Sequence, residues 1–139
     1  GPKKDKKFIN KIISQIKSKH KDLNIVNDKM GTPTYTYDFA KNTELLINSR
    51  FWGTYNLVCE GFTSRLEVTK EIVKFFKLED KITIKEVSSN FFKEQYFVNR
   101  PKSERLINFK LNLRSLNIMR DWQTCLHEYL NKEYSEYLL

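Results

Sequence analysis

The sequence contains few glycines, cysteines and histidines, and each shortage excludes a class of site. Four of the 139 residues are glycines, namely Gly1, Gly31, Gly53 and Gly61. A dinucleotide site needs a glycine-rich turn between a strand and a helix, because only glycine lets the backbone approach the pyrophosphate closely. The four glycines form neither G-x-G-x-x-G nor a P-loop, so we expect no NAD(P) or ATP binding by this chain alone.

Cysteine and histidine are equally scarce. The two cysteines, Cys59 and Cys125, form no C-x-x-C pair, which is unlike a disulfide framework. The two histidines, His20 and His127, show no recognised metal-ligand spacing to each other or to the cysteines. We therefore expect two buried, reduced thiols and no metal site.

Long apolar runs are also absent from the chain. No run approaches the roughly 18 residues that a membrane-spanning helix needs, and the basic N-terminus is not followed by an apolar stretch. The composition, 40% apolar, 14% aromatic and 30% charged, is that of a soluble globular domain. With neither a repeat nor a Gly/Ser-rich linker, residues 1–139 are expected to form a single cytoplasmic unit without a membrane segment.

The positive charge is concentrated at the N-terminus. The net charge is +8, and the segment Gly1 to Asp22 has eight lysines against two aspartates, 8 − 2 = +6. Apolar residues at helical spacing lie between these lysines: Phe8, Ile9, Ile12, Ile13 and Ile16. The pattern favours a surface helix docked through its isoleucines over attraction of a phosphate-bearing ligand or nucleic acid. Nucleic acid is further disfavoured because no arginine cluster, RNP-like motif or helix-turn-helix pattern is present.

Apolar periodicity predicts three short strands and about four helices, which alternate along the chain. Strands are expected at Asn24–Asn27, Gly53–Cys59 and Lys81–Val87. Beyond the N-terminal helix, helices are expected from Thr36 or Asp38 to about Ile47, from a capping box at Ser64 to about Phe76, and after Asp121. This alternation indicates the α/β class with parallel strand pairing.

The segment Gly31 to Ala40, GTPTYTYDFA, resembles the stretch that enters the substrate-side lobe of the dTDP-4-dehydrorhamnose reductase family. These are extended short-chain dehydrogenases that reduce sugar nucleotides. The similarity continues through GTYNL at Gly53, SRLE at Ser64, RPKSERL at Arg100 and RDW at Arg120, in the family's order and spacing. It covers the chain from about Lys4 to Leu130, so the chain looks like the C-terminal substrate-binding lobe of an extended Rossmann-type reductase.

The resemblance implies a function for the parent enzyme and little chemistry for this chain alone. NAD(P)H would reduce the C4 keto group of a nucleotide-diphosphate sugar, toward dTDP-L-rhamnose. The glycine-rich turn and the catalytic tyrosine and lysine lie upstream of Gly1 in the family pattern, in an N-terminal Rossmann domain that this chain lacks. The chain alone is then inactive and binds no cofactor, and the parent could form a homodimer. Two alternatives stay open: a non-catalytic regulatory relative of the same family, and a basic nucleic-acid-binding module.

For substrate binding, the candidates are Thr32, Pro33, Thr34 and Arg100. A guanidinium can bind two diphosphate oxygens at once, and a Thr-Pro-Thr turn can offer hydroxyl groups from a rigid loop. The alternative, held equally open, is that the turn only caps a helix and that Arg100 pairs with a carboxylate. Tyr37 and Lys41 form a Y-x-x-x-K pattern, but the family places them outside the catalytic helix, so we predict no catalytic role for them.

Overall fold

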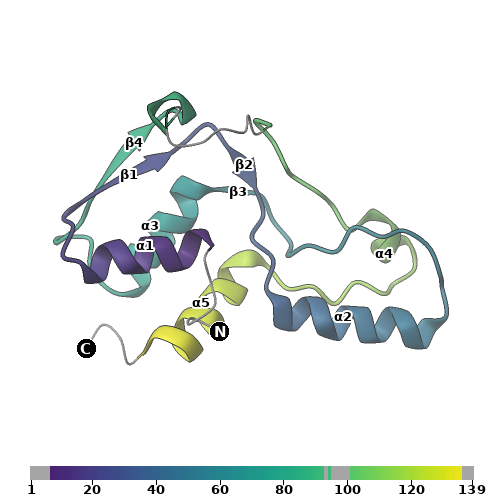
Figure 1. The fold of residues 1–139 in the computed structure, drawn as a ribbon. Coiled ribbons are helices and arrows are strands. Elements are labelled where there is room, and N and C mark those ends of the chain that lie inside the picture. The colour runs from purple at the N-terminus through teal and green to yellow at the C-terminus, as the bar shows by residue number, and fades with distance from the viewer. Residues whose placement is uncertain (1–6, 93, 95–100, 136–139) are drawn as a thin grey trace.

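The computed structural model describes residues 7–92, 94 and 101–135. Its elements follow the order α1 (Phe8–Lys17), β1 (Asp22–Val26), β2 (Met30–Gly31), α2 (Thr36–Ser49), β3 (Thr63–Ser64), α3 (Arg65–Phe75), β4 (Thr83–Val87), the 3-10 helix η1 (Ser89–Phe92), α4 (Phe109–Leu113) and α5 (Trp122–Tyr134). The molecule is elongated, with β1, β4, α1 and α3 at one end and α2 and α4 at the other (Figure 1). The expected α/β class with few short strands is confirmed, with five α-helices in the described part of the chain.

The larger end is a small parallel sheet with helices packed beside it. Strands β1 and β4 pair in parallel from Asp22 opposite Thr83 to Val26 opposite Val87, as the alternation of strands and helices predicted. The core joins α1, β1, α3 and α5 through buried apolar side chains that include Leu23, Ile72 and Leu130. In α1, Ile12, Ile13 and Ile16 are buried, so this helix docks through its isoleucines as expected.

Side-chain caps fix the starts of α3 and α5. The Ser64 hydroxyl accepts a hydrogen bond from the Glu67 backbone N–H at 3.2 Å, which confirms the serine half of the predicted capping box. The Glu67 carboxylate lies 3.1 Å from the Lys70 ammonium, one turn further along α3. Asp121 accepts from the Thr124 N–H at 2.8 Å and begins α5 where the sequence placed it.

The predicted strand Gly53–Cys59 is wrong for this structure, although the segment is extended. Its backbone groups bind side chains instead of a neighbouring strand. The buried Asn108 side chain accepts from the Val58 N–H at 3.0 Å and donates to the Val58 carbonyl at 2.8 Å. Lys110 donates to the Thr54 carbonyl at 3.0 Å. The sequence pattern of a strand is present, but no described strand lies beside it to form a ladder.

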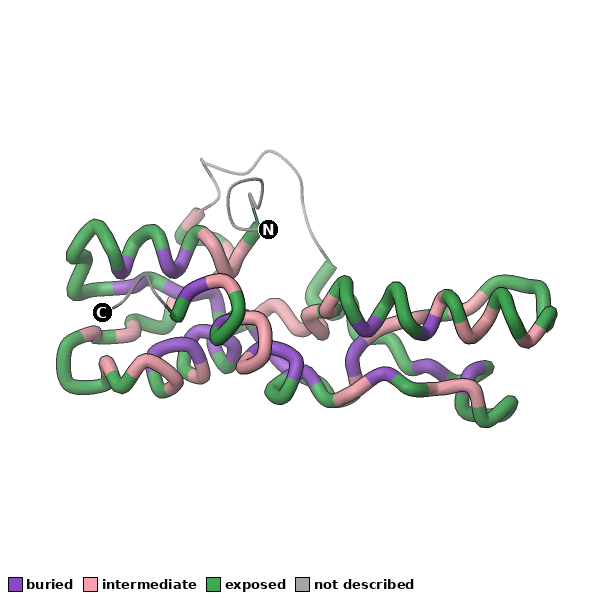
Figure 2. The backbone as a smooth tube through the Cα atoms, turned by 90° about the horizontal axis from the view of Figure 1, so that it is seen from below, coloured by how far each residue is buried: buried purple, intermediate pink, exposed green. Residues whose placement is uncertain are grey.

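Helix α2 differs from expectation in its cap and in its buried face. Its N-cap is Tyr35, which makes no side-chain cap, whereas Thr36 and Asp38 lie inside the helix. The buried side chains of α2 are polar, Asp38 and Asn42, whereas the apolar side chains of Phe39 and Ile47 are exposed, at 46% and 55%. We call residues 36–58 and 105–118 the arm. Figure 2 shows this elongated part with exposed and half-buried residues along most of its length.

Helix length bears on whether the described part of the chain could cross a bilayer. None of its helices is long and apolar enough to do so, and α2 has 14 residues.

Candidate functional site

A cavity of about 640 Å³ lies where the start of α1, the turn before α2, and helices α3 and α5 meet. Aromatic and aliphatic side chains form much of its wall, among them Phe8, Met30, Val68, Trp122 and Tyr129. Among the described residues, the charged ones that line it are Lys7, Lys29, Arg65 and Glu104. A concave apolar site with three cations and one carboxylate at its border suits a ligand that is partly apolar and carries negative charge.

The structure places the predicted Thr-Pro-Thr turn directly in this wall. Thr32, Pro33 and Thr34 all line the cavity, as does Pro101. The Thr32 hydroxyl donates to the Gly61 carbonyl at 2.8 Å, so it also joins the turn to the loop before β3. Arg100, the fourth predicted binding residue, lies outside the described residues. The location is therefore consistent with the prediction, and the binding role stays a prediction.

Gly61 supports this wall through its backbone conformation. Its φ is +89°, a value that L side chains rarely adopt, and an added Cβ would lie 3.1 Å from the Trp122 ring. We expect Gly61→Ala to lower the free energy of unfolding by about 1–2 kcal/mol. Urea denaturation followed by circular dichroism measures this. Gly31→Ala is the matched control, because no atom lies within 4 Å of the Cβ added there.

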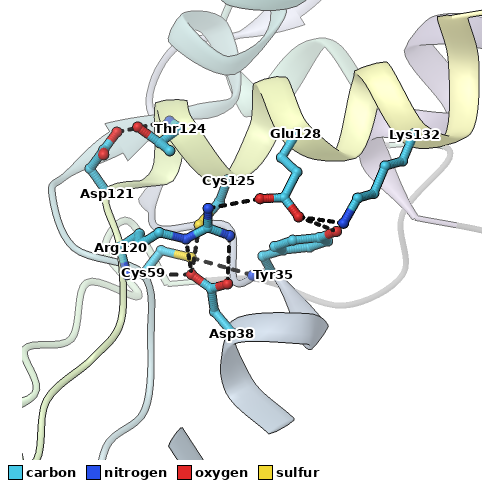
Figure 3. Close-up of polar contacts among 9 residues, drawn as sticks. All are labelled: Tyr35, Asp38, Cys59, Arg120, Asp121, Thr124, Cys125, Glu128 and Lys132. Carbon is cyan, nitrogen blue, oxygen red and sulfur yellow. Dashed lines mark hydrogen bonds and ion pairs between the residues drawn. The ribbon is translucent and has the colours of Figure 1, made fainter. Parts of the chain in front are cut away.

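A buried ion pair joins α2 to the segment before α5. Asp38 is 4% exposed and accepts from the Arg120 guanidinium through both carboxylate oxygens, at 2.9 Å from Nε and 2.7 Å from Nη2 (Figure 3). These charge-assisted bonds lower the pKa of Asp38 and raise that of Arg120. Asp38 therefore does not cap α2. Its side chain holds the arm to the rest of the molecule.

Arg120 also links this pair to a second group of polar residues on α5. Its Nη1 lies 2.7 Å from the Glu128 carboxylate, which in turn binds Lys132 at 2.6 Å (Figure 3). Hydrogen bonds from Lys132 and Arg120 lower the pKa of Glu128. The Tyr35 hydroxyl donates to Glu128 at 3.4 Å, and burial together with this carboxylate raises the pKa of Tyr35. The group fixes the Tyr35 ring in the wall of the cavity.

Both cysteines adjoin this network. They are free and buried, as expected, and burial raises the pKa of each thiol. Cys125 donates to Asp38 at 3.2 Å, while Cys59 accepts from the Tyr35 N–H at 3.3 Å.

The Y-x-x-x-K residues lie on the arm side of the network. The Lys41 ammonium is 4.4 Å from the centre of the Tyr37 ring, and Lys132 is 4.9 Å from the same ring. Tyr37 is thus flanked by two cations in a cation–π arrangement. In the described part of the chain, no group of three or more His, Cys, Asp or Glu side chains is placed to hold a metal ion.

Several residues of the site were missed by sequence analysis. Lys29 and Arg65 line the cavity beside the Thr-Pro-Thr turn. Trp122, which was not among the predicted binding residues, is 6% exposed and forms part of the cavity wall. One signal in the sequence could have identified two of these residues. Arg65 and Trp122 lie in the SRLE and RDW motifs, which are part of the family resemblance.

Fold and cavity define a small α/β domain with a candidate ligand-binding site. Residues 2–135 match the family model described as the RmlD substrate binding domain, and the chain therefore belongs to this family. Among solved structures it is similar to dTDP-4-dehydrorhamnose reductases from Clostridium acetobutylicum (27% identity, TM-score 0.84) and Yersinia enterocolitica (29%, 0.83). The resemblance seen in the sequence is thereby confirmed. The search of curated proteins finds no match.

The chain matches only part of these relatives. It aligns over 93% and 94% of its own length but covers 44% of the Clostridium protein and 45% of the Yersinia protein. The Bacillus anthracis reductase, solved in complex with NADP, has the same fold at 24% identity and a TM-score of 0.79, with 94% of this chain and 44% of that chain covered. The chain thus spans less than half the length of these reductases.

Proposed function

We propose that this chain is the substrate-binding part of an NAD(P)-dependent sugar-nucleotide reductase that acts in nucleotide-sugar biosynthesis, most like dTDP-4-dehydrorhamnose reductase. The observation that carries the proposal is the cavity beside the Thr-Pro-Thr turn, in a chain of the RmlD substrate binding domain family. Its ligand would be a nucleotide-diphosphate sugar. The apolar and aromatic wall suits the sugar and base, and the cations at the border suit the diphosphate.

Within this proposal, Thr32, Pro33, Thr34 and Arg100 contact the substrate. Pro33 restricts the backbone of the turn, so the atoms that face the cavity are held in place before the ligand binds. Because the Thr32 hydroxyl donates its hydrogen to Gly61, its role is to hold the turn in position, and its oxygen can still accept a hydrogen bond from a ligand. Arg100 supplies the bidentate diphosphate contact.

The cofactor does not fit the residues of this chain. No glycine-rich turn precedes any helix in the sequence, so no segment offers the close backbone approach that a pyrophosphate needs. NADP or NAD would therefore bind to an N-terminal half that carries the catalytic tyrosine and lysine, and this chain alone would be inactive.

The arm supports the docking of such a half. Phe39 and Ile47 form an apolar stripe on α2 that the described residues leave exposed, and Trp52 is 74% exposed. Residues 53–58 are extended but lie in no ladder. An apolar helix face left exposed in this way is typical of a surface that packs on another part of a protein. We infer that the dinucleotide-binding half packs on the α2 stripe.

Arg100→Ala in the complete reductase tests the substrate site. We expect KM for the nucleotide sugar to rise about 10- to 100-fold, because one bidentate charge-assisted contact is lost. The melting temperature should stay unchanged. Steady-state kinetics with NADPH measures the effect, and Lys102→Ala is the matched control on the neighbouring segment. Unchanged kinetics in Arg100→Ala would contradict the assignment of Arg100.

The sequence encoded upstream of Gly1 tests the whole proposal. A glycine-rich turn followed by Y-x-x-x-K is expected there, since both are needed for hydride and proton transfer. If a glycine-rich turn is present but the tyrosine and lysine are replaced, the protein is a non-catalytic relative. Absence of both patterns would refute the assignment of a reductase.

A further inference from the structure

Cys59 and Cys125 are distant in the sequence but adjacent in the structure. The segment that ends at Glu60 runs beside the start of α5, where the Glu60 N–H donates to the Arg120 carbonyl at 2.9 Å and the Trp122 N–H donates to the Glu60 carbonyl at 3.1 Å. Cys125 lies one helical turn after Asp121, the residue paired with Glu60, so its side chain projects from the same side of α5. Both sulfurs lie at the same group of residues at the start of α2: Cys125 Sγ is 3.2 Å from the Asp38 carboxylate and Cys59 Sγ is 3.3 Å from the Tyr35 backbone nitrogen (Figure 3).

The surroundings of this pair tolerate the loss of both thiol protons. The Asp38 carboxylate, which accepts from Cys125, keeps its two bonds to Arg120 at 2.9 Å and 2.7 Å. The sulfur of Cys59 accepts from the Tyr35 N–H, and it remains an acceptor in a disulfide. Forming an S–S bond would therefore leave no buried polar group without a partner.

Of the two cysteines, Cys125 is the one among the residues that line the cavity. Cys125 contributes to the wall of the cavity near Leu126 and Tyr129. The residues are otherwise well covered, with Cys59 at 2% and Cys125 at 3% exposure. An oxidant must therefore be small enough to enter through the cavity, which favours hydrogen peroxide over bulky disulfides.

We propose that Cys59 and Cys125 are a peroxide-reactive pair that closes to a disulfide in the folded chain. The thiolate of Cys125 attacks one peroxide oxygen, the O–O bond breaks, and protonation of the leaving hydroxide gives one water and a sulfenic acid on Cys125. The Cys59 sulfur then attacks this sulfenic sulfur, releases a second water and forms the S–S bond. Two thiols are oxidised and one hydrogen peroxide is reduced to two waters. This inference does not depend on the proposed function.

The environment sets both the speed of this reaction and its consequence. Burial and the adjacent Asp38 raise the pKa of Cys125, so little thiolate is present at neutral pH and the reaction needs excess peroxide. The cross-link joins the loop before Gly61 to α5. Because the Gly61 carbonyl accepts from Thr32, the disulfide would restrain the wall that carries the Thr-Pro-Thr turn.

The test is to oxidise the purified folded chain with excess hydrogen peroxide and then count free thiols after unfolding. We expect the count to fall from two to none and to return to two with dithiothreitol. Peptide mapping should recover residues 59 and 125 in one cross-linked peptide and distinguish this from sulfoxidation of Met30 and Met119. The melting temperature of the oxidised chain should rise by roughly 5–10 °C, because the cross-link closes a long loop.

Two controls decide whether folding creates the pair. Cys59→Ser and Cys125→Ser should show no reversible cross-link within the chain, and the remaining thiol should progress to sulfinic acid. The wild-type chain unfolded in guanidinium before oxidation should give several-fold less cross-link, because the thiols are then far apart. Equal cross-linking in the unfolded chain, or irreversible loss of both thiols in the folded chain, would overturn the proposal.

Discussion

Arg120→Met is expected to destabilise the chain more than any other single surface-accessible substitution discussed above. It leaves the Asp38 carboxylate, 4% exposed, without a cation and with only the Cys125 thiol and the Arg120 backbone N–H as donors. Breaking a fully buried pair costs about 3–5 kcal/mol. Because the Arg120 side chain is 39% exposed, water screens part of the interaction, and we expect a loss of about 2–3 kcal/mol, measured by urea denaturation at pH 7.

The pH dependence of this loss identifies its cause. In the wild-type chain the pKa of Asp38 is lowered, so its contribution to stability is present above the unfolded pKa and is lost as pH falls through the folded value. In Arg120→Met, burial instead favours the neutral carboxyl and raises its pKa. The difference in stability between the two proteins should therefore shrink when the pH is lowered from 7 to about 4. A difference independent of pH would contradict this assignment.

Two variants control for side-chain packing. Arg120→Lys keeps the charge but loses the two-pronged geometry, so we expect roughly half of the destabilisation. Asp38→Asn combined with Arg120→Met removes both charges. The double variant should lose less stability than the sum of the losses in the two single variants. Strict additivity would show that Asp38 and Arg120 do not act as a pair.

Local sequence patterns predicted the elements whose partners are within the described chain. The isoleucines of α1, the serine cap of α3 and the aspartate cap of α5 were all found where the pattern placed them. Strands β1 and β4 also form as expected, since each has the other as its parallel neighbour. In these cases the local signal and the packing lead to the same structure.

The errors concentrate in the arm, and they share a physical reason. The sequence of α2 has the pattern of a helix, and the segment 53–59 has the pattern of a strand in a sheet. In this chain the helix buries Asp38 and Asn42 while Phe39 stays exposed, and the extended segment binds Asn108. Periodicity identifies which face seeks burial, but it cannot supply the covering surface. The ion pair of Asp38 with Arg120 was also missed, because such long-range partners leave no local pattern.

This mismatch leads to the second large prediction, that Phe39→Asp with Ile47→Asp abolishes docking of the dinucleotide-binding half. Both side chains are about half exposed in the chain alone, so the double substitution should change its own stability by no more than about 1 kcal/mol. If the α2 stripe is buried by the other half, two carboxylates must be desolvated there without partners. We expect association between the separately expressed halves to weaken at least about 100-fold, measured by isothermal titration calorimetry.

Phe91→Asp is the matched control for this experiment. Phe91 is 60% exposed and lies in η1, at the opposite end of the molecule from the arm (Figure 1). It replaces a comparably exposed aromatic side chain by one carboxylate, as each of the two arm substitutions does, so it should leave association within about threefold of the wild-type value. Equal weakening by Phe91→Asp would trace the effect to net charge, and full association of the arm variant would place the docking surface elsewhere. A loss confined to Phe39 and Ile47 would show that the exposed stripe of α2 is an interface within a larger enzyme.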